Sequence, residues 1–444
     1  MSGARGQSLV RGLSLAGVVA LVVGNMVGTS IYTLPASLAA AVGPMGIVAW
    51  LLTAVGYLGV ALVYASLGTR FPRTGGPYVY AREAFGDFAG FETVWLYWLS
   101  AVLGNAGITI GVIGYVEGLI PTLAASVPLK FALGQAMLWG LCWLNVRGVK
   151  GSARLQIAIM LMNIVPLLGL TMWSARAFDP GNLRPFAPKG WSSLAAGAAL
   201  IVWAYSGVES ATVPAEEVRS PERMISRGTL IGYAIATLVF VSTSIIVAGV
   251  LPNAVVASSA RPIAMAVGRG VGPWAAIVIS VGAIVAGTGT LNGWMLMSGR
   301  IPVSAAEDGL FFAALSRIHP RFRTPHVALV VGTAVASATL LLMFNHTLLD
   351  AFDFIVLLTV WLTLVPHLFA AAAELALARR DRDQYTPAQR RRAQVFGSLA
   401  FVAVLWFIYG SGAEVGRWGF LVLAAGIPLY VWFVTRGKTA PGST

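Results

Sequence analysis

The chain has 444 residues, of which 57% are apolar and only 11% are charged, and its mean hydropathy is +0.78. Because a soluble domain carries about a quarter charged residues, this composition excludes a soluble globular protein and indicates a polytopic protein of the lipid bilayer. A single cysteine, Cys142, excludes an intramolecular disulfide bond.

Twelve segments are long and apolar enough to cross a bilayer, which takes about 20 residues. In chain order they are 13–41, 45–69, 88–120, 126–147, 152–174, 192–215, 224–251, 274–301, 326–345, 349–376, 393–411 and 415–436. A shorter, mixed segment at 255–272 is expected to form a helix on the outer surface. The sequence therefore predicts an all-α membrane protein with 12 transmembrane helices.

Basic residues alternate between the two sides of this arrangement. With residues 1–12 in the cytoplasm, 23 of the 30 Lys and Arg residues fall on the inner side and 7 on the outer side. Such an excess follows the positive-inside rule and supports cytoplasmic positions for residues 1–12 and 437–444. The net charge of +13 is thus a signal of topology, and no nucleic-acid partner is expected.

The first span is interrupted near its middle by the stretch G-N-M-V-G-T-S-I-Y, residues 24–32. Unpaired backbone groups are costly in lipid, so irregular backbone at this depth is tolerated only where it lines a cavity or packs in protein. The stretch predicts a helix that unwinds and restarts. On this evidence alone it fits equally well a close helix contact, because Gly24 and Gly28 have Gly-xxx-Gly spacing.

The sixth span, I-V-W-A-Y-S-G-V-E-S-A-T-V-P at 201–214, is interrupted at Ser206 and Gly207. Spans one and six occupy the same place in two five-helix halves, 13–174 and 192–376, and paired interruptions of this kind point to a midplane substrate site. A restarting helix offers free N–H groups to a carboxylate, and an ending helix offers free carbonyls to an ammonium group. A zwitterionic amino acid needs one of each.

Five stretches of the chain, taken together, resemble the amino acid–polyamine–organocation (APC) transporters. They are G-N-M-V-G-T-S-I-Y-T-L-P-A (24–36), T-G-G-P-Y-V-Y-A-R-E-A-F-G (74–86), V-W-A-Y-S-G-V-E-S-A (202–211), G-W-M-L-M-S-G-R (293–300) and A-A-E-D-G-L-F (305–311). Within that superfamily the chain is most similar to the bacterial arginine/agmatine and related basic amino acid/polyamine antiporters. The resemblance covers nearly the whole length.

The resemblance implies the LeuT/APC fold, with two inverted five-helix repeats followed by two further spans at 393–436. It implies exchange of one amino acid, possibly a cationic one, for another amino acid or an amine at the bacterial inner membrane, and a homodimer. Transferred by motif, the substrate carboxylate meets the amides around Thr29 and Ser30, the amino group meets carbonyls near Trp203 and Ser206, and Trp294 lies beside the side chain. The implied contact residues are Asn25, Gly28, Thr29, Ser30, Asn105, Trp203, Ser206, Gly207, Trp294, Thr359 and Thr363.

Ionisable groups at membrane depth are costly and by default functional. Glu209 is therefore expected to act as a proton-linked gate, with a structural glutamate as the alternative. His367 stands where the family has tyrosine and is a second proton-linked candidate, with a packing histidine as the alternative. By resemblance, Tyr78, Tyr97 and Trp203 are gating aromatic residues.

Exchange is favoured over ion-driven uptake because the fifth span lacks the lysine that proton-coupled relatives carry. A proton-coupled symporter or uniporter for neutral amino acids remains the alternative. A membrane-embedded enzyme would need a convergent nucleophile–base or metal set, and the spans supply neither. No cofactor and no metal site are expected.

Overall fold

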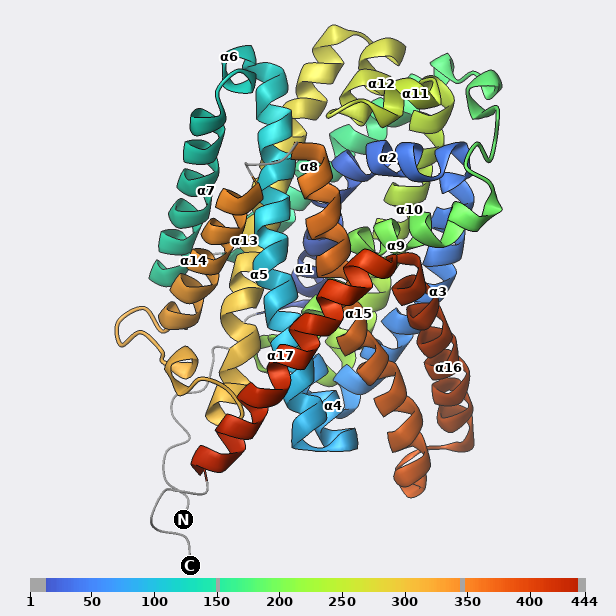
Figure 1. Ribbon diagram of the computed structural model, residues 1–444. Coiled ribbons are helices and arrows are strands. Elements are labelled where there is room, and N and C mark those ends of the chain that lie inside the picture. The colour runs from blue at the N-terminus through green and yellow to red at the C-terminus, as the bar shows by residue number, and fades with distance from the viewer. Residues whose placement is uncertain (1–12, 149–151, 344–347, 438–444) are drawn as a thin grey trace, which may run out of the picture.

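The computed structural model describes residues 13–148, 152–343 and 348–437, and these form a bundle of helices joined by short loops (Figure 1). Ten helices in these ranges are long and apolar enough to cross a membrane, and each matches a predicted span. The predicted span 326–345 coincides with a shorter apolar helix, His326–Leu342, and the predicted span 152–174 coincides with a helix of 23 residues, Ser152–Ser174. The all-helical, multi-pass prediction is confirmed, while the expected cytoplasmic segments 1–12 and 437–444 lie, apart from Gly437, outside the described residues.

Several helices begin with proline, a residue that suits a helix N-terminus. Proline stands at the first helical position of α4, α10, α13 and α16, where its missing N–H costs nothing. The long helices are α3 (Gly46–Arg70), α5 (Asp87–Leu119), α7 (Val127–Arg147), α8 (Ser152–Ser174), α10 (Pro221–Val250), α13 (Pro273–Glu307), α14 (His326–Met343), α15 (Leu348–Arg380), α16 (Pro387–Gly410) and α17 (Ala413–Gly437). The short ones include α4 (Pro77–Phe85), α6 (Pro121–Ala124), α11 (Asn253–Ala257) and α12 (Pro262–Gly270).

The first predicted span is two helices, α1 (Leu15–Met26) and α2 (Thr29–Ala41). Between them Val27 and Gly28 leave helical geometry, with φ/ψ of −89°/62° and −107°/−127°. The predicted interruption is therefore present, and α2 turns away from the direction of α1 (Figure 1).

The sixth predicted span is α-helical only over α9 (Leu194–Tyr205). Ser206 takes an extended conformation, and Gly207 has φ of +109°, a value that L-residues avoid. Short 3₁₀ turns at Ser210–Thr212 (η5) and Ala215–Glu217 (η6) follow in place of a second α-helix. The predicted interruption is present here too.

Burial separates an inner set of helices from an outer set. The most apolar stretches of α5 and α15 are 78% buried, whereas those of α7 and α17 are only 17% buried. The exposed faces of α7 and α17 are nonetheless apolar, which suits lipid and not water. The interrupted helices α1 and α9 contact the inner set, α1 against α13 and α9 against α15.

The two ends of the bundle carry different short helices. Helix α4 lies at the end where α3 finishes, and α11 and α12 lie at the opposite end beside α2 (Figure 1). The single helix expected at 255–272 is wrong in detail, because Pro262 starts a new helix and Ser258 to Arg261 separate it from α11. The Asn253 side chain on α11 donates to the Ala39 carbonyl at 3.1 Å and so ties α2 to this end.

Candidate substrate site

A cavity lies between the interruptions of the first and sixth spans. Five stretches of chain contribute to its wall: the α1–α2 junction, α5, the end of α9, α13 and α15. The lining residues are Asn25, Met26, Gly28, Thr29, Ser30, Ser100, Gly104, Ile108, Trp203, Ser206, Thr290, Trp294, Thr359 and Thr363. The lining carries polar hydroxyl and amide groups and two tryptophans but no ionised side chain.

The C-terminal end of α1 has its free carbonyls satisfied by side chains of the protein. The donor and acceptor pairs are Thr290 Oγ1 to Gly24 O (2.8 Å), Trp294 Nε1 to Asn25 O (3.2 Å), Ser30 Oγ to Met26 O (2.8 Å) and Asn163 Nδ2 to Val27 O (3.0 Å). Since helix ends leave carbonyls without helical partners, these bonds fix the break and leave little acceptor capacity at this end.

The N-terminal end of α2 is different, because no side chain caps it. Its first residues, Thr29 and Ser30, line the cavity. Uncapped N–H groups and the positive end of the helix dipole make such a position a binding site for an anion. Glycine is required at position 28 because the start of α2 packs closely against α13, and a Cβ there would overlap the Thr290 side chain.

The end of α9 offers the opposite polarity. The Val202 carbonyl accepts from both the backbone N–H and the hydroxyl of Ser206, at 2.9 and 3.1 Å. Among the described residues, no side chain and no backbone N–H of another segment donates a hydrogen bond to the carbonyls of Trp203 and Ala204. The free carbonyls at the end of α9 lie across the cavity from the uncapped N–H groups at the start of α2. This combination suits a molecule that carries both an ammonium and a carboxylate group.

Another part of the wall is formed by α5 and α15. The Thr359 hydroxyl is buried there without a hydrogen-bond partner, and Gly104 leaves room for the Trp203 ring, which a Cβ would meet at 3.4 Å. An unpartnered buried hydroxyl is costly unless a ligand or water supplies a bond. This part of the wall is therefore suited to a hydrogen-bonding side chain beside aromatic rings.

Nine of the eleven predicted contact residues line the cavity, and Asn105 and Gly207 do not. On α5 the lining positions are Ser100, Gly104 and Ile108, each one helical turn from the next, and Asn105 lies about 100° further round that helix. Gly207 instead donates its N–H to Glu209, at 3.1 and 3.3 Å. The lining residues absent from the prediction are Met26, Ser100, Gly104, Ile108 and Thr290, and of these the three α5 residues were detectable by their four-residue spacing.

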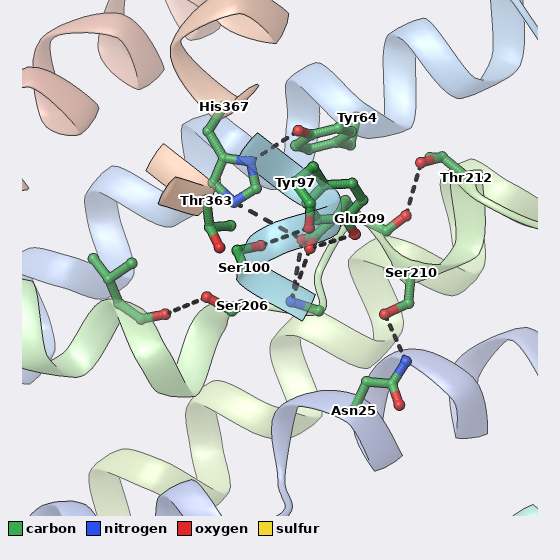
Figure 2. A network of polar contacts seen from close by, with 12 residues as sticks. Asn25, Tyr64, Tyr97, Ser100, Ser206, Glu209, Ser210, Thr212, Thr363 and His367 are labelled. Atoms are coloured by element: carbon green, nitrogen blue, oxygen red, sulfur yellow. Dashed lines mark hydrogen bonds and ion pairs between the residues drawn. The ribbon is translucent and has the colours of Figure 1, made fainter. Parts of the chain in front are cut away.

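A buried polar cluster adjoins the cavity (Figure 2). Glu209 is fully buried and accepts a hydrogen bond from the Tyr97 hydroxyl at 2.9 Å. His367 Nε2 lies 3.9 Å from the Glu209 carboxylate, and its Nδ1 is 2.8 Å from the Tyr64 hydroxyl. Three predicted gating residues, Tyr97, Glu209 and His367, are thus brought together, whereas Trp203 lies in the cavity wall.

Tyr78 lies apart from this cluster, at the end of the bundle that carries α4. Its hydroxyl donates to Asp308 at 2.7 Å, and Arg82 pairs with Asp308 and, at 2.7 Å, with Asp87. Burial, followed by the neighbouring Asp308 carboxylate, raises the pKa of Tyr78 above its usual range. These contacts join α4 to the end of α13 and leave Tyr78 a permanent hydrogen-bond donor.

A second ion pair ties the segment after α9 to α13. Arg300 Nε lies 2.8 Å from Glu217, and both side chains are largely buried. In the described ranges no group of three His, Cys, Asp or Glu residues is placed to hold a metal ion.

The chain matches the family model of the amino acid permeases over residues 13–432. It is 29% identical to an arginine/ornithine antiporter of Pseudomonas aeruginosa (94% of this chain, 90% of the relative) and 28% identical to an arginine/agmatine antiporter of Chlamydia abortus (96% and 90%). It is 31% identical to a cadaverine/lysine antiporter of Escherichia coli K12 (68% and 69%). The predicted resemblance is confirmed, and this chain belongs to the amino acid permease family of the APC superfamily.

Proposed function

We propose that this protein exchanges one amino acid for another amino acid or an amine across the bacterial plasma membrane by alternating access. The observation that carries the proposal is the cavity itself, which lies between the uncapped start of α2 and the free carbonyls at the end of α9. The relatives named above, which are antiporters of amino acids and amines, support the same activity.

In this proposal the substrate carboxylate accepts from the amides of Thr29 and Ser30, and the ammonium group donates to carbonyls near Trp203. The side chain then extends along Trp294 toward Thr359, with Asn25, Gly28, Ser206, Gly207, Asn105 and Thr363 shaping or supporting the site. A cationic side chain would gain about 2 kcal/mol from a desolvated aromatic face, which compensates in part for the absence of an ionised residue in the lining.

The proposed topology has twelve spans, with residues 13–174 and 192–376 as inverted repeats and 393–436 as the last two spans. Both chain termini lie in the cytoplasm, so the end of the bundle with α4 is the inner face. The basic residues of the loops support this orientation. We include a homodimer in the proposal on the strength of the resemblance alone.

Gating is assigned to the aromatic and ionisable residues on the inner side of the cavity. Tyr97, Glu209 and His367 close the path directly below the substrate, with Trp203 above them and Tyr78 at the inner end. Opening inward requires the Tyr97–Glu209 bond (2.9 Å) to break. The Arg300–Glu217 pair (2.8 Å) must separate as well.

Counterflow in liposomes tests the proposal. Purified protein is reconstituted and the uptake of radiolabelled arginine, ornithine, lysine, alanine and serine is measured with and without the same amino acid inside. We expect uptake of at least one of the five only with internal substrate, and we expect Trp294→Ala to abolish it while Trp139→Ala, on the exposed face of α7, leaves it intact. Uptake that needs a proton gradient and no internal substrate would instead establish the symporter.

A further inference from the structure

A polar stripe runs along one face of α15, which is otherwise apolar. Thr359, Thr363, His367 and Glu374 are separated by four, four and seven residues, a spacing that keeps them on one side of a helix. The first two line the cavity, and His367 and Glu374 are 1% and 2% exposed. Ionisable groups buried at membrane depth in this way are costly and mark functional paths.

The upper station of the stripe is His367, which lies between two oxygen-bearing groups (Figure 2). Its Nδ1 bonds the Tyr64 hydroxyl on α3, and its Nε2 faces Glu209 at 3.9 Å without a hydrogen-bond partner. The other titratable groups around the pair are Tyr97 on α5, which bonds Glu209, and Tyr57 on α3, whose ring lies edge-on to the imidazole at 5.9 Å. An imidazole held this way can accept a proton at one nitrogen and release another from the second.

The lower station is Glu374, two helical turns closer to the inner face. One of its oxygens accepts from the Ser66 hydroxyl on α3 at 2.7 Å, and the other is buried without a partner. Arg70 on α3 faces it, and that guanidinium lies 3.4 Å from Asp381 and 4.0 Å from the ring centroid of Tyr385. Asp381 is partly exposed, so the stripe reaches solvent at this end.

The interval between the stations is about 10 Å, since seven residues of α-helix rise 1.5 Å each. On the same face of α15 it holds the small side chains of Ala370 and Ala371. The Tyr80 ring from α4 lies 6.2 Å from that of Tyr64, and its hydroxyl is buried near Gly68 of α3. Proton transfer over this distance requires bridging water that hydrogen-bonds to polar groups in the interval.

From these contacts we propose that the α3–α15 interface conducts protons between the inner face and Glu209, through Glu374 and His367. The proposal rests on the orientation proposed above. An incoming proton reaches His367 through the Tyr64 hydroxyl, which takes it up at its oxygen and gives its own proton to Nδ1. The Nε2 proton then passes to Glu209, which changes from carboxylate to carboxylic acid while the imidazole returns to neutral. Release in the reverse direction restores the first tautomer of the ring.

The last step is controlled by the substrate site. A separation of 3.9 Å is too long for a hydrogen bond, so Glu209 must turn toward His367 before it takes the proton. Its present bonds are to Tyr97 and to the Gly207 amide, which belongs to the interruption of α9. Movement of that interruption when substrate binds would therefore release Glu209 to the relay.

Infrared spectroscopy tests the relay without any transport measurement. In the full-length protein in lipid, the carboxylic acid band lost in Glu209→Gln is identified, and its rate of hydrogen–deuterium exchange is followed after a switch to D₂O. We expect Glu374→Gln and His367→Phe to slow this exchange about tenfold or more, because each removes an acid–base station. The matched control is Glu92→Gln, which alters another buried, unpartnered carboxyl that faces α17 and not α15.

Wild-type exchange rates in both Glu374→Gln and His367→Phe would overturn the proposal. So would the absence of any Glu209-dependent carboxylic acid band between about pH 5 and pH 8, the range in which an imidazole relay operates. Equal slowing in Glu92→Gln would assign the effect to general loosening of the bundle and would also overturn it. Because the measurement needs no substrate, it is independent of the counterflow result.

Discussion

Replacing Gly207 by alanine tests whether the interruption of α9 is required for exchange. Gly207 has φ of +109°, and a Cβ would lie 3.0 Å from Asn25 Cβ and 3.2 Å from its carbonyl carbon. The left-handed backbone costs an L-residue about 1–2 kcal/mol, and crowding in a packed interior adds about 1–3 kcal/mol. The two costs add to about 2–5 kcal/mol, and the lower limit of about 2 kcal/mol on the conformation that exchanges substrate already lowers the exchange rate about 30-fold.

The matched control is Gly86→Ala, between α4 and α5. Gly86 has φ of +88°, but a Cβ there meets nothing within 4 Å. Both variants should lower the melting temperature, whereas only Gly207→Ala should lose exchange in the counterflow assay. If Gly207→Ala exchanged as fast as Gly86→Ala, the close contact between the two interruptions would have no part in transport.

Three further results are expected. Trp294→Phe keeps an aromatic face but loses the hydrogen bond to the Asn25 carbonyl, so the affinity for a transported amino acid, measured by thermal shift, should fall several-fold. Trp294→Ala should lower this affinity further, by about 10-fold or more. Equal affinities in the wild type and both variants would remove Trp294 from the site. Glu209→Gln should flatten the pH profile of exchange and leave affinity nearly unchanged, and an unaltered profile would reject a proton-linked Glu209. The neighbouring Arg380 and Arg70 hold the pKa of Asp381 below its usual value, so the ion pair stabilises the fold above about pH 4 and this stabilisation is lost as the pH falls further. Asp381→Asn should therefore lower the melting temperature at pH 7 and reduce the drop in melting temperature on acidification. An equal lowering of the melting temperature at every pH would count against this.

The sequence was sufficient to locate the ten membrane-length helices and both interruptions. Lipid makes unpaired backbone groups so costly that small and polar residues in mid-span have few explanations, and the corresponding positions of residues 24–32 and 201–214 removed most of the ambiguity. The geometry after Gly207 was beyond prediction, because nothing in S-A-T-V-P indicates that the chain continues as 3₁₀ turns.

Side-chain positions around the cavity were harder to predict. Asn105 was assigned to the site by motif, but the register of α5 turns Gly104 to the cavity in its place. Thr290 was missed because its role, a bond to the Gly24 carbonyl, depends on α13 lying against the broken end of α1. His367 was noted as an isolated residue, and only the packing of α3 on α15 shows that Tyr64 and Glu209 flank it.

The most direct test of the substrate site is an experimental structure of the protein with a bound amino acid. The amino acid to use is the one, among arginine, ornithine, lysine, alanine and serine, that exchanges fastest in the counterflow assay. The account predicts density in the cavity, with the carboxylate within hydrogen-bond distance of the Thr29 and Ser30 amides and the amino group near the Trp203 and Ala204 carbonyls. An amino acid bound outside this cavity, or an α9 that continues as an α-helix through Ser206 in the bound state, would contradict it.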